Sequence, residues 1–367
     1  MPSHGPVMLD LAGAFMGPER KDLLTRHERY AASLARLSGQ ESVTLRVILP
    51  QRFRGHQGLG RVTSHVELTA GLPQLHPRFL FSAARRTGLE FTPSMWVASD
   101  PFSSGPMQLV GARRTGRPLQ VQAHGDFGLG ALDRNWAWAS AKRILAQRLL
   151  LAADNVRTVS HEQARTLTSR FSLDPERVFV APVPIHEAYL KTPLGAEERP
   201  LRILFAGRIH PERGLTLWAQ TAHLIAHREP RAVFDIVGAG PHEPELRSLL
   251  QALPRVTWHG WLPASRVATL MLQSKVLLST PHFESYGRSL TEALCMGLHV
   301  VATDTTGARR LSQSASARVA WNADDLAELA VEGLSLPVDP DKTERARREQ
   351  EIRDEEAVVT VARSWMS

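Results

Sequence analysis

The sequence predicts an α/β protein built from two doubly wound, Rossmann-like domains that face each other across a cleft. Short apolar segments rich in β-branched residues recur along the 367 residues, and helix-length segments separate them. Segments that are apolar nearly throughout are typical of parallel strands covered on both faces. A stretch with several prolines and no periodicity, near 183–198, divides these segments into two sets. One sheet would not hold them all, so two sheets are expected.

The expected elements follow one another in a regular alternation. The strands of the first domain are expected at 43–49, 94–99, 118–123, 156–160 and 178–182. Those of the second domain are expected at 201–207, 232–238, 255–260, 276–280 and 299–303, and helices at 131–152 and 214–228. We therefore expect an N-terminal domain over 1–185, a C-terminal domain over 198–345, and a charged helix over 346–367 that packs on the N-terminal domain. Ligands bind such folds at the carboxyl ends of the strands, which here would line the cleft.

Composition excludes several classes of protein. Apolar residues make up 43% and charged residues 22%, which is usual for a folded chain with a sizeable core and excludes a mainly disordered one. The single cysteine, Cys295, excludes a disulfide framework and a cysteine-based zinc site, and it favours a reducing compartment. No apolar run reaches the roughly 20 residues of a membrane span, and the first residues lack the layout of a secretory signal. We expect a cytoplasmic protein.

The net charge of +7 is unevenly distributed. Residues 1–190 hold 23 Lys/Arg and 15 Asp/Glu of the 44 and 37 in the chain, which leaves 21 and 22 for 191–367. A basic half favours an anionic partner, such as a phosphate-bearing substrate, a membrane surface or a nucleic acid. The clusters Gln51–Arg61 and Gly111–Arg117 can supply a face for anionic lipid at the inner side of a membrane. The alternative is that a coding bias toward arginine produces the excess positive charge, which then lies on an ordinary solvated surface.

The most informative stretch runs from 276 to 303. A strand leads into a loop that contains Glu284, Gly287 opens a helix, and Glu292 lies in the second turn of that helix. A carboxylate offers two acceptor oxygens, which suits the vicinal diol of a ribose. The N–H groups of residues 287–289 would be free to hold an anion such as a diphosphate. The alternative is a solvated loop glutamate beside an ordinary helix glutamate.

Two further strand ends carry glycines. After the strand at 201–207, Gly207 is followed by Arg208 and Arg213, two cations that can clamp a phosphate group. The strand at 232–238 ends in Gly238-Ala-Gly240, which lets a base or sugar approach the main chain but lacks the third glycine of a dinucleotide fingerprint. Taken alone, such arginines are more often solvated.

Together these segments resemble the donor-binding half of the family 4 glycosyltransferases, which have the GT-B fold and retain anomeric configuration. The matching segments are FAGRIHPERG (205–214), IVGAGP (236–241) and ESYGRSLTEALCMG (284–297), the last with the family's E-x7-E spacing. The resemblance implies that Glu292 binds the ribose of a nucleotide sugar, that Glu284 faces the sugar, and that Arg208 and Arg213 hold the diphosphate. It further implies donor contacts from Gly207, Gly238, Gly260, Trp261, Ser285, Tyr286, Gly287 and Arg288.

The chain departs from the family at several points. Arg213 stands where the family usually has lysine, and Leu298-His299 follow Gly297 where Gly-x-Pro is usual. In place of a glycine-rich loop after the first strand the chain offers only Gly13 and Gly17, which are assigned to acceptor or phosphate contact. The strand end at His124 and Asp126 resembles the family's histidine-bearing loop, which implies a catalytic His124 facing the donor sugar. Asp100, at another strand end, is a further candidate for acceptor contact.

The expected function is a retaining glycosyltransferase that moves a sugar from a nucleotide-diphosphate sugar to a sugar, lipid-linked or small-molecule acceptor. By the resemblance, the acceptor hydroxyl attacks from the front side, in the assembly of a surface polysaccharide or glycolipid. The motifs hold no group of residues at metal-ligand spacing, so we expect no metal and no cofactor besides the co-substrate. Alternatives are a GT-B phosphorylase or epimerase and a catalytically silent scaffold. Nucleic-acid binding is disfavoured, because the chain has only three tyrosines to interleave with its basic residues.

Overall fold

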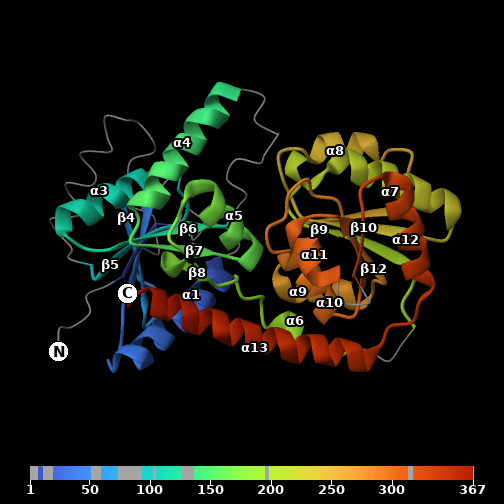
Figure 1. Cartoon of the computed structure of the whole chain (residues 1–367). Coiled ribbons are helices and arrows are strands. Elements are labelled where there is room, and N and C mark those ends of the chain that lie inside the picture. The colour runs from blue at the N-terminus through green and yellow to red at the C-terminus, as the bar shows by residue number, and fades with distance from the viewer. Residues whose placement is uncertain are drawn as a thin grey trace. The chain divides into compact units, whose positions relative to one another are not determined.

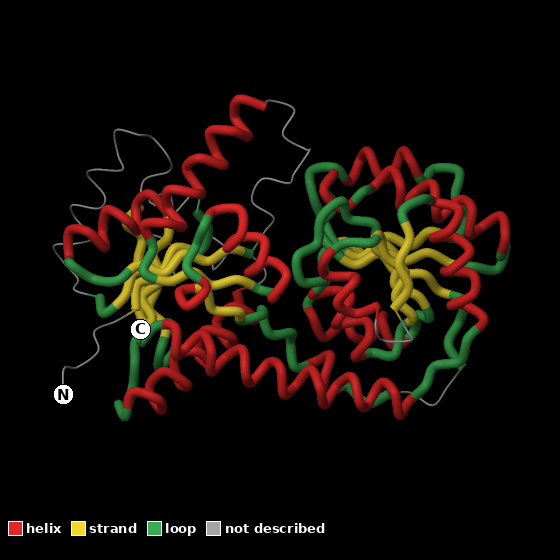
Figure 2. The backbone as a smooth tube through the Cα atoms, viewed as in Figure 1, coloured by secondary structure: helices red, strands yellow, loops and turns green. Residues whose placement is uncertain are grey.

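The computed structural model describes residues 7–10, 20–50, 59–72, 93–101, 105–124, 136–194, 198–312 and 317–366. The chain divides into two compact units, one formed by Met1–Pro184 with Glu355–Ser367 and the other by Ile185–Asp354. Each unit is a layer of strands between layers of helices (Figures 1 and 2). The two doubly wound sheets expected from the sequence are therefore confirmed.

The first unit is built on an eight-stranded sheet of order β3-β4-β2-β1-β5-β6-β7-β8. All neighbouring pairs are parallel except β3 and β4. The strands are β1 (Val7–Asp10), β2 (Leu45–Pro50), β3 (Gly60–Arg61), β4 (Val66–Leu72), β5 (Met95–Ala98), β6 (Leu119–Ala123), β7 (Asn155–Thr158) and β8 (Val178–Val180). The helices are α1 (Arg20–Ser38), α3 (Gly105–Thr115), α4 (Trp136–Ala152), α5 (His161–Phe171), the short η3 (Pro175–Arg177) and the last part of α13 (Pro340–Ser364).

Two apolar clusters cover the two faces of this sheet. Val47 and Val97 belong to one cluster, whereas Ile48 and Trp96 belong to the other, as the alternation of side chains along a strand requires. The first cluster also includes Trp365, which follows α13. Because both faces are covered, the strands are apolar at nearly every position, which is the pattern that made them recognisable in the sequence.

The second unit is built on a six-stranded parallel sheet of order β11-β10-β9-β12-β13-β14. Its strands are β9 (Arg202–Ala206), β10 (Val233–Val237), β11 (Val256–Gly260), β12 (Val276–Ser279), β13 (His299–Thr303) and β14 (Ala317–Ala320). Its helices are α6 (Ala188–Lys191), η4 (Pro211–Arg213), α7 (Leu215–Arg228), α8 (Glu243–Leu249), α9 (Ala264–Leu272), α10 (Arg288–Cys295), α11 (Thr306–Ser312), α12 (Ala323–Ser335) and the start of α13. Phe205 and Leu204, neighbours on β9, again pack into opposite clusters.

The strands predicted from the sequence agree with the observed ones to within about two residues, whereas β1, β3, β4 and β14 were not predicted. The expected linker at 183–198 contains the boundary after Pro184 and the short helix α6. The final helix begins at Pro340, ahead of the expected 346. Within the described residues, no helix has the length and apolar character needed to cross a bilayer.

A buried histidine in the first unit predicts a pH dependence of stability. His27 on α1 is 5% exposed, and its Nδ1 lies 2.7 Å from the carbonyl oxygen of Leu23. Burial, together with the charges of Arg26 and Arg157, lowers the pKa of His27 to about 3. The unfolded chain takes up this proton near pH 6.5 and the folded chain only near pH 3. The free energy of unfolding should therefore fall as the pH drops through this window, by at most about 1.4 kcal/mol per pH unit.

Urea unfolding at pH 7 and pH 5 tests this expectation. His27→Gln has no imidazole to protonate, so its unfolding midpoint should fall less on acidification than that of the unaltered chain. His161→Gln, on the exposed first turn of α5, is the matched control and should keep the full fall. An equal fall in all three proteins would contradict the prediction.

Candidate functional site

The carboxyl ends of β9, β10 and β11 carry loops that are joined through their main chains. Gly207 N donates to Val237 O at 3.0 Å, and Gly238 N donates to Gly260 O at 2.8 Å. Gly238 has a φ of +134°, and a Cβ there would lie 1.8 Å from Gly207 O. The neighbouring loop therefore leaves no room for a side chain at position 238. The sequence motif did not reveal this reason for the glycine. Gly260, with a φ of +63°, has open space around its Cβ position, and Trp261 beside it is exposed.

The loop after β9 is anchored to the loop after β12. A Cβ at Gly214, whose φ is +61°, would lie 1.9 Å from Thr280 O. The Thr280 hydroxyl donates to the carbonyl oxygens of Arg213 and Gly214, both at 3.1 Å. Neither Gly214 nor Thr280 was recognised as a site residue from the sequence. Together they fix the segment that carries the two predicted phosphate-binding arginines.

Arg213 and Glu284 form the centre of the candidate site. Arg213 Nη1 donates to Glu284 Oε2 at 3.0 Å, and the two side chains are 32% and 19% exposed. The other oxygen of Glu284, Oε1, accepts from Gly287 N at 3.1 Å. The sequence pattern predicted a Gly287 N–H that is free to hold an anion, and this was wrong, because the carboxylate of Glu284, three residues earlier, turns back and accepts from it. The sequence motif thus brings a half-buried cation, a carboxylate and the start of α10 into one hydrogen-bonded group.

The second glutamate of the motif lies deeper. Glu292 is buried on α10, and its Oε1 is 2.9 Å from Arg288 Nε, one turn earlier on the same helix. Arg208 has different surroundings, because its exposed side chain pairs with Glu212 of its own loop at 2.9 Å. Of the two predicted phosphate-binding cations, the structure therefore places only Arg213 against a predicted sugar-binding carboxylate.

Tyr286 was expected to contact the donor, but its ring is buried within the unit. The Arg310 guanidinium lies over this ring, 4.2 Å from its centroid, and donates to Tyr286 O and to Thr291 Oγ1 at 3.2 and 2.8 Å. Gly307 N donates to the main-chain oxygen of Glu284 at 2.6 Å. Arg310 and Gly307 are thus supporting residues that the sequence did not identify. Ser285 remains half-buried in the same loop.

In the first unit, His124 follows β6, and its Nε2 lies 2.8 Å from Gln122 Oε1. Loss of solvation, then the charges of Arg157 and Arg26, lower the pKa of His124 to about 3. The imidazole is therefore neutral at pH 7. Asp100 lies at the end of β5, and its main-chain oxygen accepts from Gly105 N. The other candidates, Gly13, Gly17 and Asp126, lie outside the described residues.

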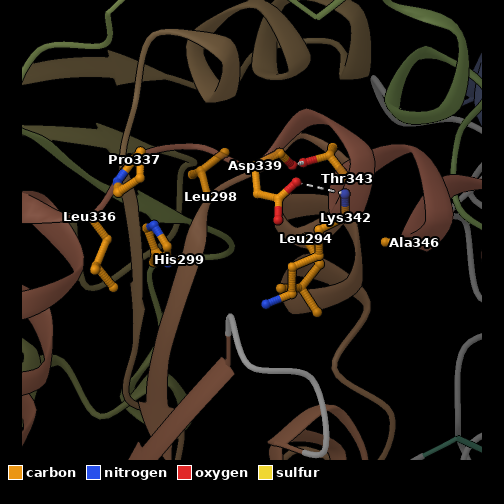
Figure 3. A pocket seen from close by; sticks show the side chains of 10 residues that line it. Leu294, Leu298, His299, Leu336, Pro337, Asp339, Lys342, Thr343 and Ala346 are labelled. Atoms are coloured by element: carbon orange, nitrogen blue, oxygen red, sulfur yellow. Dashed lines mark hydrogen bonds between the residues drawn. The ribbon is translucent and has the colours of Figure 1, made fainter.

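A cavity of about 250 Å³ lies elsewhere in the second unit (Figure 3). Its lining includes His299, at the start of β13, and Asp339 and Lys342, at the start of α13. The amino end of β13 is at the edge of the sheet opposite to the carboxyl ends that carry Arg213 and Glu284. None of the site residues predicted from the sequence lines this cavity.

Comparison with known proteins identifies related families in both halves. Residues 27–189 match the family described as Glycosyltransferase Family 4, and residues 200–336 match Glycosyl transferases group 1. The chain is 25% identical to alpha-D-kanosaminyltransferase of Streptomyces kanamyceticus over 66% of this chain and 64% of the relative. It is 26% identical to D-inositol 3-phosphate glycosyltransferase of Acidothermus cellulolyticus over 58% of this chain and 52% of the relative. The alignments thus span about half to two thirds of these relatives.

Solved structures show the same fold. The Anabaena protein Alr3699/HepE, in complex with UDP and glucose, superimposes with a TM-score of 0.67 at 16% identity over 98% of each chain. WaaG, a glycosyltransferase involved in lipopolysaccharide biosynthesis, gives a TM-score of 0.68 at 15% identity over 94% of this chain and 95% of WaaG. These likenesses agree with the two doubly wound units described above. The chain belongs to the family 4 glycosyltransferases and has the GT-B fold.

Proposed function

We propose that this protein is a retaining glycosyltransferase that transfers a sugar from a nucleotide-diphosphate sugar to an acceptor hydroxyl. The observation that carries the proposal is the group of Arg213, Glu284 and the Gly287 N–H at the carboxyl edge of a parallel sheet. Ligands of doubly wound folds bind at this edge. Transferases among the relatives, and the UDP and glucose bound by the Anabaena protein, support a nucleotide-sugar donor.

The chemistry of the proposed reaction centres on the departing diphosphate. A guanidinium has five N–H donors, and Glu284 engages Nη1 of Arg213, so the remaining donors can meet phosphate oxygens without breaking the pair. Negative charge that develops on the leaving oxygen would be stabilised by this cation, which is already held in place. Glu284 is fixed through both oxygens, and its remaining lone pairs can accept from sugar hydroxyls. Glu292 would hold the ribose.

The acceptor is proposed to be a sugar or a lipid-linked sugar in the assembly of a surface polysaccharide or glycolipid. WaaG and the galactosyltransferase WaaB, which likewise superimposes on this chain, are named for lipopolysaccharide and its outer core. The basic composition of residues 1–190 supports an anionic acceptor. When the acceptor hydroxyl attacks from the front side of the sugar, no protein nucleophile is needed. Retention of the anomeric configuration therefore does not require a nucleophilic side chain among the proposed site residues.

A thermal-shift screen of UDP-, GDP- and ADP-sugars tests the donor assignment. A ligand that binds only the folded chain raises its melting temperature by mass action. One nucleotide series should raise the melting temperature and identify the base, and radiolabelled transfer to a lipid extract should then follow. Melting that no nucleotide sugar changes would overturn the proposal and favour a silent scaffold.

Glu292→Gln is expected to weaken binding of that nucleotide sugar by about 10- to 100-fold, the range for losing a hydrogen bond to a charged group. The buried carboxylate pairs with Arg288, so the variant also leaves this arginine without its charged partner. Titration calorimetry measures the affinity. Glu328→Gln, exposed on α12, is the control and should bind as the unaltered chain does. Equal affinities of the two variants would remove the ribose role of Glu292.

Turnover is expected to persist in millimolar EDTA. Arginine side chains and main-chain N–H groups can neutralise a diphosphate by themselves. Asp339 and Asp341 do form an Asp-x-Asp sequence, but Asp339 Oδ1 accepts from Lys342 N at the start of α13, away from the candidate site. Loss of turnover that Mg²⁺ or Mn²⁺ restores would contradict this expectation.

A further inference from the structure

The long helix α13 has a buried stripe whose chemical character changes along its length. The stripe is polar in its first half and apolar in its second half: Thr343, Arg347, Gln350 and Asp354 are followed by Ala357, Val358, Val361 and Ala362. The change falls between Asp354 and Glu355, where the chain passes from the second unit to the first. The buried face of a helix is normally apolar, because a buried polar group is costly unless it is hydrogen-bonded. The polar half is therefore expected to have specific partners in the second unit.

One partner is the carboxyl end of α10, the helix that carries Glu292. Arg347 Nε donates to the main-chain oxygen of Cys295, the last residue of α10, at 2.6 Å, and Nη2 donates to Met296 Sδ at 3.5 Å. Among the described residues, no carboxylate forms an ion pair with Arg347. Its buried charge therefore acts on the carbonyl end of α10, where the helix dipole is negative. The first half of α13 lies next to α10 (Figure 1).

The other partner is Tyr286, in the loop that precedes α10. Gln350 Nε2 donates to the Tyr286 hydroxyl oxygen at 3.4 Å and to Asp354 Oδ1 at 2.6 Å. The second oxygen of Asp354, Oδ2, accepts from Ile185 N at 3.2 Å, so the carboxylate that orients Gln350 is itself held. Tyr286 is thus fixed from two helices, by Arg310 of α11 over its ring and by Gln350 of α13 at its hydroxyl.

These contacts hold both ends of the segment that contains the two glutamates of the motif. Tyr286 lies between Glu284 and Gly287, whose side-chain to main-chain hydrogen bond belongs to the candidate site. Arg347 fixes the last turn of α10, after Glu292. A helix that is held at both ends is restrained in its position and in its rotation about its own axis. Groups that bind or react need such support from residues behind them, because small displacements lower the rate.

We propose that Gln350 and Arg347 are positioning residues for the transfer reaction, which act through α10 to place Glu284 and Glu292 for the donor. We name their contacts with the two ends of α10 the α13 clamp. The sequence predicted only a charged final helix that packs on the N-terminal domain, and this task of its first half was not recognised. The effect on transfer rests on the proposed function, whereas the clamp itself rests on the hydrogen bonds described above.

Hydrogen–deuterium exchange of the full chain tests the clamp. Tyr286→Phe removes the hydroxyl oxygen that accepts from Gln350 and keeps the ring beside Arg310. The amides of residues 284–292 should then exchange about five-fold faster relative to those of α12, the value of one ordinary hydrogen bond. Gln350→Leu should have the same effect. The matched control is Tyr30→Phe in the first unit, because this buried hydroxyl also accepts from a side chain, Arg157, at 3.3 Å.

Steady-state kinetics tests what the clamp contributes to transfer. Tyr286→Phe and Gln350→Leu should each lower kcat by about 10- to 100-fold, as displacements of roughly 1 Å do. The double variant should be no slower than the single ones, because both substitutions remove the same contact. The non-additive loss of kcat is the result that a merely structural role would not produce. If Gln350→Leu does not fold, Tyr286→Phe still decides the question.

The other end of the clamp has its own variants. Arg347→Lys keeps a donor for the main-chain oxygen of Cys295 and should retain more turnover than Arg347→Met. Lys275→Met is the matched control. Lys275 is also buried and donates to a helix carbonyl, that of Leu334 at 3.0 Å in the last turn of α12, which carries no predicted site residue. Its removal should leave turnover unchanged in the folded protein.

Two results would overturn the proposal. Residues 284–292 that exchange at the same rate in Tyr286→Phe, Gln350→Leu and Tyr30→Phe would refute the clamp. Faster exchange together with turnover equal to that of the controls would refute its role in positioning. Failure of the proposed function is a different result, because the unaltered chain would then show no thermal shift with any nucleotide sugar, whatever the exchange rates of the variants.

Discussion

Replacing Arg213 by methionine is expected to lower transfer turnover by about 10²- to 10³-fold, the loss typical of removing one donor that stabilises developing charge. Arg213 is half-buried and held by Glu284 at 3.0 Å, so its position is set before the donor arrives. Because the charge on the leaving diphosphate grows in the transition state, kcat should fall more than KM for the donor rises. Steady-state kinetics with the nucleotide sugar measures both.

The controls for this variant separate charge from position. Arg213→Lys keeps the charge but loses the planar fork, so it should recover part of the lost turnover. Arg318→Met removes an arginine that is likewise paired with a glutamate, on β14, and should leave turnover unchanged. Arg208→Met tests the second predicted cation, whose side chain pairs only within its own loop. Normal turnover of Arg213→Met would exclude its role in the departure of the diphosphate.

Gly238→Ala is expected to destabilise the second unit by about 2–5 kcal/mol, the sum expected for backbone strain and overpacking. An added Cβ would lie 1.8 Å from the main-chain oxygen of Gly207, a residue whose own N–H is held by Val237 O at 3.0 Å. The φ of +134° adds strain, because residues with a side chain rarely adopt it. Urea unfolding followed by tryptophan fluorescence gives the free energy.

The matched control is Gly260→Ala. Gly260 also has a positive φ, of +63°, but its Cβ position has no atom within 4 Å, so the cost should be only about 1–2 kcal/mol. The two glycines end neighbouring strands, and both were expected to border the donor. If the two substitutions destabilised the chain equally, the contact with the loop at Gly207 would not be the reason that position 238 requires glycine.

The strands could be predicted where burial on both faces makes them apolar throughout. The strands β10 and β13 satisfy this condition, because their side chains pack into the apolar clusters on both faces of the sheet. The strand β4, with the sequence VELTAGL, alternates polar and apolar residues near the sheet edge, and the four-residue β14 is too short to stand out. Edge strands carry a weaker signal because one of their faces or sides is in contact with water.

The location of the candidate site could be predicted, but its internal contacts could not. A parallel sheet brings the residues after its strands to one edge, so Arg213 and Glu284 were both expected at that edge, although their contact with each other was not predicted. The return of Glu284 onto Gly287 N, and the contact of Gly214 with Thr280, depend on the paths of loops far apart in the chain. No sequence pattern pointed to Arg310. Its guanidinium lies over the ring of Tyr286, a residue that the motif suggested for contact with the donor.

The first unit is built from two segments that lie far apart in the chain, whereas the second unit is a single segment. The chain leaves the first unit after Pro184 and rejoins it at Glu355, within the single helix α13. Trp365 then donates its indole N–H to the buried Gln120 at 3.0 Å and joins the apolar cluster of that unit. The second unit is one uninterrupted segment, whereas the first unit lacks part of its core until the segment after Asp354 is in place. A chain truncated after Asp354 should therefore expose the first unit, and not the second, to proteases.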